Sequence, residues 1–143
     1  MSWKSMLIEE KINKIREDFS FFDNWEEKYQ YLIDLGKKLP KLDENLKTDE
    51  FRIKGCTSNL WVVPKIQDGK ITFLGSSDSV IVQGLFYLVQ FVYNNEEPIA
   101  IMNEPLDFFD EIGLSSHLGP SRTNGFNSLK NQINQIATDL SKN

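Results

Sequence analysis

Cys56 is the only cysteine in this chain of 143 residues, and it lies in the stretch RIKGCTSNLW at residues 52–61. Its neighbours Gly55, Thr57 and Ser58 are small residues that favour turns, and they separate two apolar segments. Such a loop is an unusual place for a buried structural thiol, whereas a partly exposed thiol can ionise and act as a nucleophile. Cys56 is therefore the first candidate for chemistry, although an inert cysteine stays open as the alternative.

Three other residues could assist a nucleophilic thiol if folding brings them close to it: His117, Asp78 and Arg122. The imidazole could serve as a base, and a guanidinium beside the thiol would favour its ionised form. Each residue also has a structural interpretation, because His117 suits a loop, Asp78 suits a helix N-cap and Arg122 suits a surface ion pair. A hydrolase that uses Cys56 with His117 is conceivable from residue types, but the spacing gives it no specific support.

The counts of ligand-type residues argue against a metal centre. A structural zinc site or an iron–sulfur cluster needs about four Cys or His ligands, and the chain has one of each. The stretch GSSDSVIVQG, at residues 75–84, has neither the phosphate-loop nor the dinucleotide-binding pattern of glycines. We therefore expect no metal and no bound cofactor.

The composition is that of an ordinary globular protein, with 40% hydrophobic and 26% charged residues. A net charge of −5 argues against nucleic acid as the main partner. The N-terminus is charged without an apolar signal region, and no apolar run is long enough to span a bilayer. We expect one domain over residues 1–143, in the cytoplasm and without a membrane partner. Whether it forms a homodimer stays open.

Hydrophobic periodicity predicts an α+β fold, in which a small three-stranded antiparallel sheet packs with N-terminal, central and C-terminal helices. Two helices precede residue 40, and Asn24 with Glu27 forms a capping box for the second. Lys11 is expected on the exposed side of the first. β-Branched and aromatic runs between residues 51 and 75 predict three strands, with a hairpin turn at Asp68 and Gly69.

The central helix is predicted to begin near Ser79, after a turn at residues 75–78 that includes Asp78 as a candidate cap. A short helix is expected over residues 104–114 and a longer one over residues 121–140. The apolar positions that define the central and the last helix are Ile81, Leu85, Leu88, Val92, Phe126, Leu129, Ile133, Ile136 and Leu140.

Four motifs together resemble the SufE family of sulfur acceptors for cysteine desulfurases: WEEKYQYLIDLGKKLP, GCTSNLW, GSSDSVIVQGL and SSHLGPSRTNG. The resemblance runs from about Phe19 to Ile136 and includes the order and spacing of all four. It implies the SufE/NifU-like fold, with helices around a small antiparallel sheet. The commoner family pattern has GDSD where this chain has GSSD, so Ser76 replaces an acid.

The resemblance implies that Cys56 accepts persulfide sulfur from a SufS-type cysteine desulfurase, stimulates that enzyme and passes the sulfur to an iron–sulfur scaffold complex. Motif matching gives Asp78, Arg122 and His117 supporting positions. The pyridoxal phosphate (PLP) that breaks the carbon–sulfur bond belongs to the partner, so the chain is expected to be a sulfur carrier and not an enzyme.

A persulfide exposed to cytosolic thiols would be reduced before delivery, so we expect the loop to shelter Cys56 in the free protein. Leu60 and Trp61, together with Val80 and Ile81 from the central helix, are the apolar residues expected to form the shelter. Arg122 is expected to lower the pKa of the thiol if it lies near. An independent thiol enzyme remains the alternative hypothesis.

Overall fold

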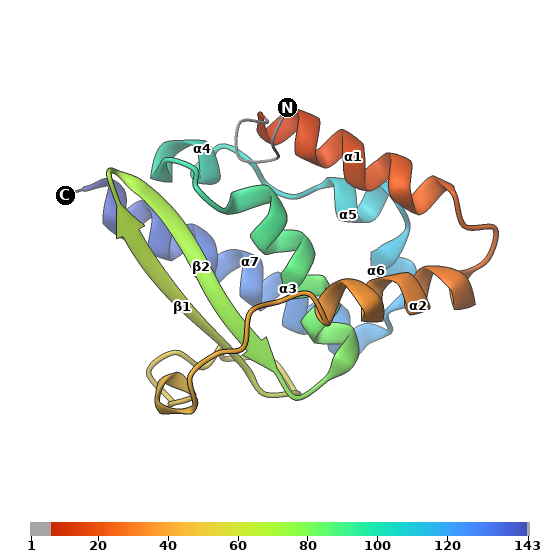
Figure 1. Cartoon of the computed structure of the whole chain (residues 1–143), viewed down its shortest axis with the longest axis horizontal. Helices are drawn as coiled ribbons and strands as arrows, with labels where there is room; N and C mark the ends of the chain where they lie inside the picture. Colours follow the sequence, from red (N-terminus) through yellow and green to blue (C-terminus); the bar gives the residue numbers. More distant parts are fainter. Residues whose placement is uncertain (1–6, 143) are drawn as a thin grey trace.

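Helix α3 (Val80–Tyr93) forms the centre of the computed structural model, which describes residues 7–142. Its sequence, VIVQGLFYLVQFVY, is apolar around most of the helix circumference, as expected for a helix that other elements cover. Helices α1 (Ile8–Ser20) and α2 (Trp25–Gly36) and strand β2 (Lys70–Ser77) pack against it. Figure 1 shows α7 (Pro120–Ser141) running behind α3 and the β-hairpin.

The two N-terminal helices form where the sequence predicts them. Asn24 caps α2, since its side chain accepts a hydrogen bond from the Glu27 N–H at 2.9 Å. The Glu27 carboxylate accepts from the N–H of Asp23 at 3.4 Å and not from Asn24, so the predicted capping box is shifted by one residue. A short 3₁₀-helix, η2 (Glu44–Leu46), interrupts the polar connection to the sheet.

Glycines allow α2 and α3 to approach closely. A Cβ on Gly84 would lie 2.2 Å from the carbonyl oxygen of Leu32, and one on Gly36 would lie 2.8 Å from the Gly84 nitrogen. Both contacts involve backbone atoms, which cannot move aside at low cost. The close approach fixes the N-terminal half of α3, which lies next to the candidate site described below.

Strand β1 (Leu60–Gln67) pairs with β2 in an antiparallel hairpin whose register places Ile66 opposite Ile71. The predicted turn is confirmed: Asp68 and Gly69 have φ values of 54° and 78°, as a two-residue hairpin turn with two positive φ angles requires. Pro64 lies within β1, on a strand at the edge of the sheet, where its missing N–H costs no ladder bond.

The prediction of three strands is wrong, because the described residues contain a sheet of two strands. The segment expected as a third strand pairs with β1 only through a bridge between Arg52 and Trp61. A turn precedes it, with the Arg52 N–H bonded to the Asp49 carbonyl, and Gly55 at φ +88° turns the chain away after it. Too few extended residues remain between these turns to form a ladder.

Side chains from α3 take the place of a strand along the outer edge of β2. Gln90 donates to the Phe73 carbonyl at 2.9 Å, and the Phe73 N–H donates to Asn94 Oδ1 at 2.9 Å. Nearer the N-terminus of α3, Gln83 Oε1 accepts from the Ser77 N–H at 2.6 Å. On the same edge, Ile71 pairs with the backbone of residues 95 and 96, so much of the outer edge of β2 is bonded without a third strand.

The C-terminal half is more finely divided than the sequence predicts. Helix α4 (Pro98–Met102) was not predicted. The helix expected over residues 104–114 is instead α5 (Phe108–Glu111), followed after Gly113 by the single turn α6 (Leu114–His117). Helix α7 agrees with its prediction and buries one face, with Ile136 and Leu140 only partly buried. The buried residues of that face are Gly125, Phe126, Leu129, Ile133 and Ala137.

Lys11 does not lie on the exposed side of α1, contrary to the prediction, because its side chain is only 1% exposed. Its Nζ donates to the carbonyls of Val92 and Asn94, both at 3.3 Å, and to Glu96 Oε2 at 2.8 Å. The ammonium therefore satisfies carbonyls at the C-terminus of α3, where a cation is electrostatically favoured. Lys11 has a structural role, anchoring α1 on the central helix.

Candidate functional site

The loop that carries Cys56 consists of residues 54–58. The residues just before it are hydrogen-bonded to the residues just after it, which closes the loop at its base. The Ile53 N–H donates to the Leu60 carbonyl at 2.8 Å, and Arg52 Nε donates to Asn59 Oδ1 at 2.9 Å. Gly55, with φ +88°, makes the turn that precedes the cysteine, a conformation that residues with a Cβ rarely adopt. The base of the Cys56 loop is thus fixed, and the cysteine lies near its tip.

The Cys56 loop rests on one face of α7. Cys56 Sγ donates to the Gly125 carbonyl at 3.5 Å, and Gln132 Nε2 donates to the Lys54 carbonyl at 3.0 Å. A Cβ on Gly125 would lie 3.1 Å from Sγ, and a Cβ on Gly55 would lie 2.4 Å from Ser128 Oγ. The two glycines let loop and helix touch, and the contacting helix residues recur every three or four positions.

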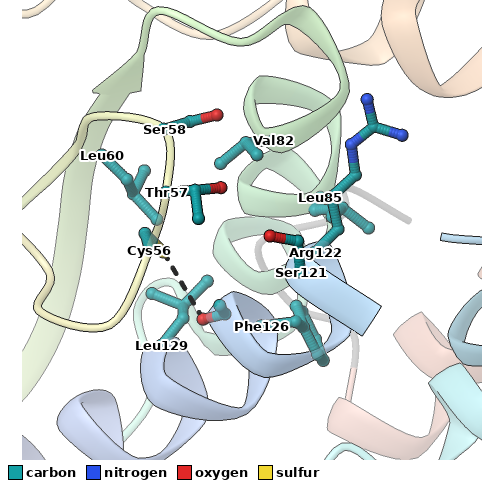
Figure 2. A pocket seen from close by; sticks show the side chains of 11 residues that line it. Cys56, Thr57, Ser58, Leu60, Val82, Leu85, Ser121, Arg122, Phe126 and Leu129 are labelled. Atoms are coloured by element: carbon teal, nitrogen blue, oxygen red, sulfur yellow. Dashed lines mark hydrogen bonds between the residues drawn. The ribbon is translucent and has the colours of Figure 1, made fainter. Parts of the chain in front are cut away.

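Cys56 is half-buried and borders a small cavity. The volume is about 20 Å³, which is room for roughly one water-sized group. Figure 2 shows the side chains that surround the cavity, with the Cys56 thiol directed at α7. The lining residues beyond the loop itself are Leu60, Val82, Leu85, Ser121, Arg122, Gly125, Phe126 and Leu129.

The expected shelter exists but is formed by different residues of α3. Val82 and Leu85 line the cavity, whereas Val80 is 60% exposed and neither it nor Ile81 is a lining residue. Helix geometry explains the difference, because Val82 and Leu85 lie on a face of α3 that residue 80 does not share. Leu60 lines the cavity as expected, and Trp61 does not.

Burial raises the pKa of the Cys56 thiol above its ordinary value, and the positive charge of Arg52 opposes this effect. Burial is the larger influence. In this position of the loop the sulfur is therefore held mainly as the neutral thiol at neutral pH, which is less nucleophilic than the thiolate.

Arg122 lines the same cavity but is not the cation that lowers the pKa of Cys56. Its side chain is exposed, and Figure 2 shows the guanidinium extending away from the cysteine. The expectation that Arg122 activates the thiol electrostatically is therefore wrong for this arrangement. Arg52, which the sequence did not single out, has that effect.

Asp78 acts on the loop through Asn59 and does not cap α3. Its two carboxylate oxygens accept from the Asn59 backbone N–H at 3.1 Å and from Asn59 Nδ2 at 2.9 Å. The cap of α3 is Ser79, whose hydroxyl accepts from the Val82 N–H at 3.3 Å. Asp78 therefore ties the end of the Cys56 loop to the start of α3.

His117 is exposed on α6 and does not line the cavity beside Cys56. Its ring stacks on Trp25, with centroids 3.9 Å apart and planes inclined by 14°. Nδ1 lies 3.0 Å from the Gly113 carbonyl oxygen. The structure thus brings Cys56 and Arg122 to one cavity, links Asp78 to the loop through Asn59, and engages His117 elsewhere.

No group of three or more His, Cys, Asp or Glu side chains among residues 7–142 could hold a metal ion.

Sequence reasoning missed four residues that the geometry makes important, namely Arg52, Asn59, Gly125 and Gln132. Arg52 and Asn59 flank the cysteine within one short segment, a spacing that suits a side-chain bond across the base of a loop. Gln132 gave no such signal, because its contact depends on how the loop meets α7.

A family model described as an Fe-S metabolism associated domain, SufE, matches residues 13–137. The chain belongs to the SufE family. The resemblance seen in the four sequence motifs is thereby confirmed, and family membership associates the chain with iron–sulfur metabolism.

Two relatives of this SufE-family chain are uncharacterised SufE-like proteins. That of Rhizobium meliloti (strain 1021) is 37% identical over 131 residues, covering 88% of this chain and 94% of the relative. That of Rhizobium etli is 35% identical over 131 residues, covering 88% of each. A solution structure of a hypothetical protein from Thermus thermophilus superposes with a TM-score of 0.77 at 18% identity, covering 93% of this chain and 97% of that one. The likeness to this solved structure supports the fold alone.

Within residues 7–142, no helix combines the length and apolar character needed to cross a membrane.

Proposed function

We propose that this SufE-family protein is a sulfur carrier, which accepts persulfide sulfur on Cys56 from a SufS-type cysteine desulfurase and stimulates that enzyme. The observation that carries the proposal is the setting of Cys56: a single thiol on a loop with a fixed base, resting on α7 beside a cavity of about 20 Å³. A cavity of this size has room for about one added atom beside the thiol.

The transfer step needs only one nucleophilic sulfur on this chain. The Cys56 thiolate attacks the outer sulfur of the donor's persulfide, and a new S–S bond forms as the donor's S–S bond breaks. The donor sulfur leaves as a thiolate, and its electron pair comes from the broken bond. No net oxidation occurs, so no redox cofactor is required on either side of the step.

The carbon–sulfur cleavage that precedes this step would be the work of PLP on the desulfurase. This division of labour fits the lining of the cavity, which includes no His, Asp or Glu among residues 7–142. His117, the base required by the alternative hydrolase hypothesis, is stacked on Trp25 and bonded at Nδ1 to Gly113. The geometry therefore favours the carrier over a hydrolase built from Cys56 and His117.

The shelter around Cys56 suits a carrier that must avoid other thiols. Burial keeps the free thiol largely protonated and covers one side of it, so reaction with small disulfides and oxidants is slowed. Delivery then requires the loop to leave α7, and a partner that binds the extended loop better than the resting one would shift this equilibrium. The proposed acceptor of the sulfur is an iron–sulfur scaffold complex. The proposed location of the protein is the cytoplasm, and we propose that residues 1–143 form one domain.

Cys56→Ser tests the proposal against a purely structural role. The serine hydroxyl can donate to the Gly125 carbonyl as the thiol does, so the loop should stay in place and the fold should be unchanged. Serine cannot hold sulfane sulfur, so the variant should bind a PLP-dependent cysteine desulfurase and fail to stimulate sulfide release from cysteine. Stimulation by the serine variant at the wild-type rate would contradict the proposal.

A further inference from the structure

Arg52 holds a fixed positive charge at the base of the Cys56 loop. Its Nε donates to Asn59 Oδ1 at 2.9 Å, and Asn59 is bonded in turn to both carboxylate oxygens of Asp78, at 3.1 and 2.9 Å. The backbone is fixed as well, because Arg52 pairs with Trp61 in a β-bridge. The side chain therefore cannot swing away from the loop without breaking this chain of bonds.

Among the described residues, 7–142, no carboxylate forms a direct ion pair with Arg52. Asp78, the carboxylate of this chain of bonds, uses both oxygens for Asn59. Within residues 7–142, the terminal guanidinium nitrogens of Arg52 have no bonded partner. Since an arginine side chain carries five N–H donors, most of its capacity to stabilise an anion is free.

Other charged groups around Cys56 are less well placed. On α7, Arg122 lines the cavity but extends away from the sulfur. Lys54, in the loop itself, is exposed and contacts α7 through its carbonyl. The residues that α3 contributes to the cavity, Val82 and Leu85, carry no charge. Of these groups, Arg52 is the cation whose charge opposes the effect of burial on the thiol.

We propose that Arg52 is a positioning residue of the sulfur-transfer site, which stabilises negative charge on Cys56, first as the thiolate and then as the persulfide anion. The persulfide part of this inference rests on the proposed function. The thiolate part does not, because it concerns the isolated protein alone.

The location of Arg52 couples loop movement to reactivity. Arg52 belongs to the base of the loop, whereas the apolar walls Phe126 and Leu129 belong to α7. When Cys56 leaves α7, it loses the burial that disfavours the thiolate and keeps the charge that favours it. The sulfur therefore becomes a better nucleophile as it becomes accessible, so that activation and exposure occur together.

The test is the pH dependence of Cys56 alkylation by iodoacetamide in the wild-type protein, Arg52→Gln and Arg52→Lys. Arg52→Gln should react about threefold to tenfold more slowly at neutral pH, the size expected for one partly screened charge. The midpoint of its alkylation rate as a function of pH should move to higher pH, while the limiting rate at high pH is unchanged. Arg52→Lys keeps the charge, so the midpoint of its alkylation rate should lie close to that of the wild-type protein.

A purely structural role for Arg52 gives a different pattern. Loosening of the loop would expose the thiol, so Arg52→Gln would react faster at every pH and the midpoint of its rate would stay or move to lower pH, and this result would overturn the inference. A lysine variant with the midpoint of the glutamine variant would do the same. Because alkylation needs no desulfurase, absence of sulfur transfer to the wild-type protein would count against the proposed function and leave the role of Arg52 to be decided by the pH profiles.

Discussion

The substitution Gly125→Ala should weaken the packing of the Cys56 loop against α7 while changing the stability of the whole protein little. Gly125 is buried within α7, where alanine is preferred over glycine by about 1 kcal/mol. Outside α7, the atoms nearest to the new methyl group would all belong to Cys56, at 3.1 Å for Sγ, 3.6 Å for Cα and 3.8 Å for Cβ. The shortest of these distances is too tight for an ordinary contact, so the loop must move outward.

The expected effect follows from these contacts. Overpacking of this kind typically costs about 1–3 kcal/mol, and the weak bond from Sγ to the Gly125 carbonyl is strained as well. A shift of about 1–2 kcal/mol between the resting and extended loop changes their ratio roughly 5- to 30-fold. Cys56 should therefore be alkylated about 5- to 30-fold faster in the variant, while the free energy of unfolding changes by less than about 1 kcal/mol because α7 gains stability.

Alkylation by iodoacetamide and unfolding by urea measure the two effects separately. Asn131→Ala is the matched control, because Asn131 is exposed on the same helix and does not line the cavity beside Cys56. The control should gain helix stability without a change in the alkylation rate. If Gly125→Ala also kept the wild-type alkylation rate, the thiol would not rest on Gly125 and the reasoning would be refuted.

Three further variants test other contacts of the molecule. Asp78→Ala removes two hydrogen bonds to Asn59 and should speed Cys56 alkylation several-fold with little loss of stability, as measured by the same two assays. Arg122→Ala should reduce sulfur transfer from a desulfurase more than Lys65→Ala, because Arg122 lines the cavity and Lys65 is exposed on β1. Lys11→Met should lower the free energy of unfolding by about 2–4 kcal/mol in urea, because it leaves the carbonyls at the end of α3 unsatisfied.

Each of these variants has a result that would count against its reasoning. Wild-type alkylation of Asp78→Ala would show that Asn59 holds the loop without the carboxylate. Equal transfer by Arg122→Ala and Lys65→Ala would remove Arg122 from the functional surface, and a large loss of stability would assign it a structural role instead. Unchanged stability of Lys11→Met would mean that water or neighbouring groups satisfy the carbonyls that Lys11 now contacts.

The elements with strong periodicity could be predicted from the sequence, and those fixed by neighbours could not. Helices α1, α2, α3 and α7 follow from their apolar spacing, and the hairpin follows from Asp68 and Gly69. The prediction of a third strand failed because turns at both ends of the segment leave Arg52 as its one residue in a β-bridge to β1. Lys11 was misplaced because its partners are carbonyls at the end of α3, which sequence patterns do not reveal.

At the site, a partly buried Cys56 on a loop could be predicted, but most of the residues that shelter it and the electrostatics could not. Motif matching drew attention to Arg122, whose side chain extends away from the sulfur, and passed over Arg52, whose charge acts on it. A side-chain direction depends on packing, and a sequence motif fixes only the position of the residue. The contact between Gln132 and the Lys54 carbonyl likewise exists only because the loop lies across α7.

The most direct test of the carrier proposal is mass spectrometry of Cys56 after incubation of the full chain with a PLP-dependent cysteine desulfurase and cysteine. The carrier proposal predicts that Cys56 gains one sulfur atom, that a reducing thiol removes it, and that omission of cysteine prevents it. If the desulfurase turned over cysteine while Cys56 remained an unmodified thiol, the central claim would be contradicted.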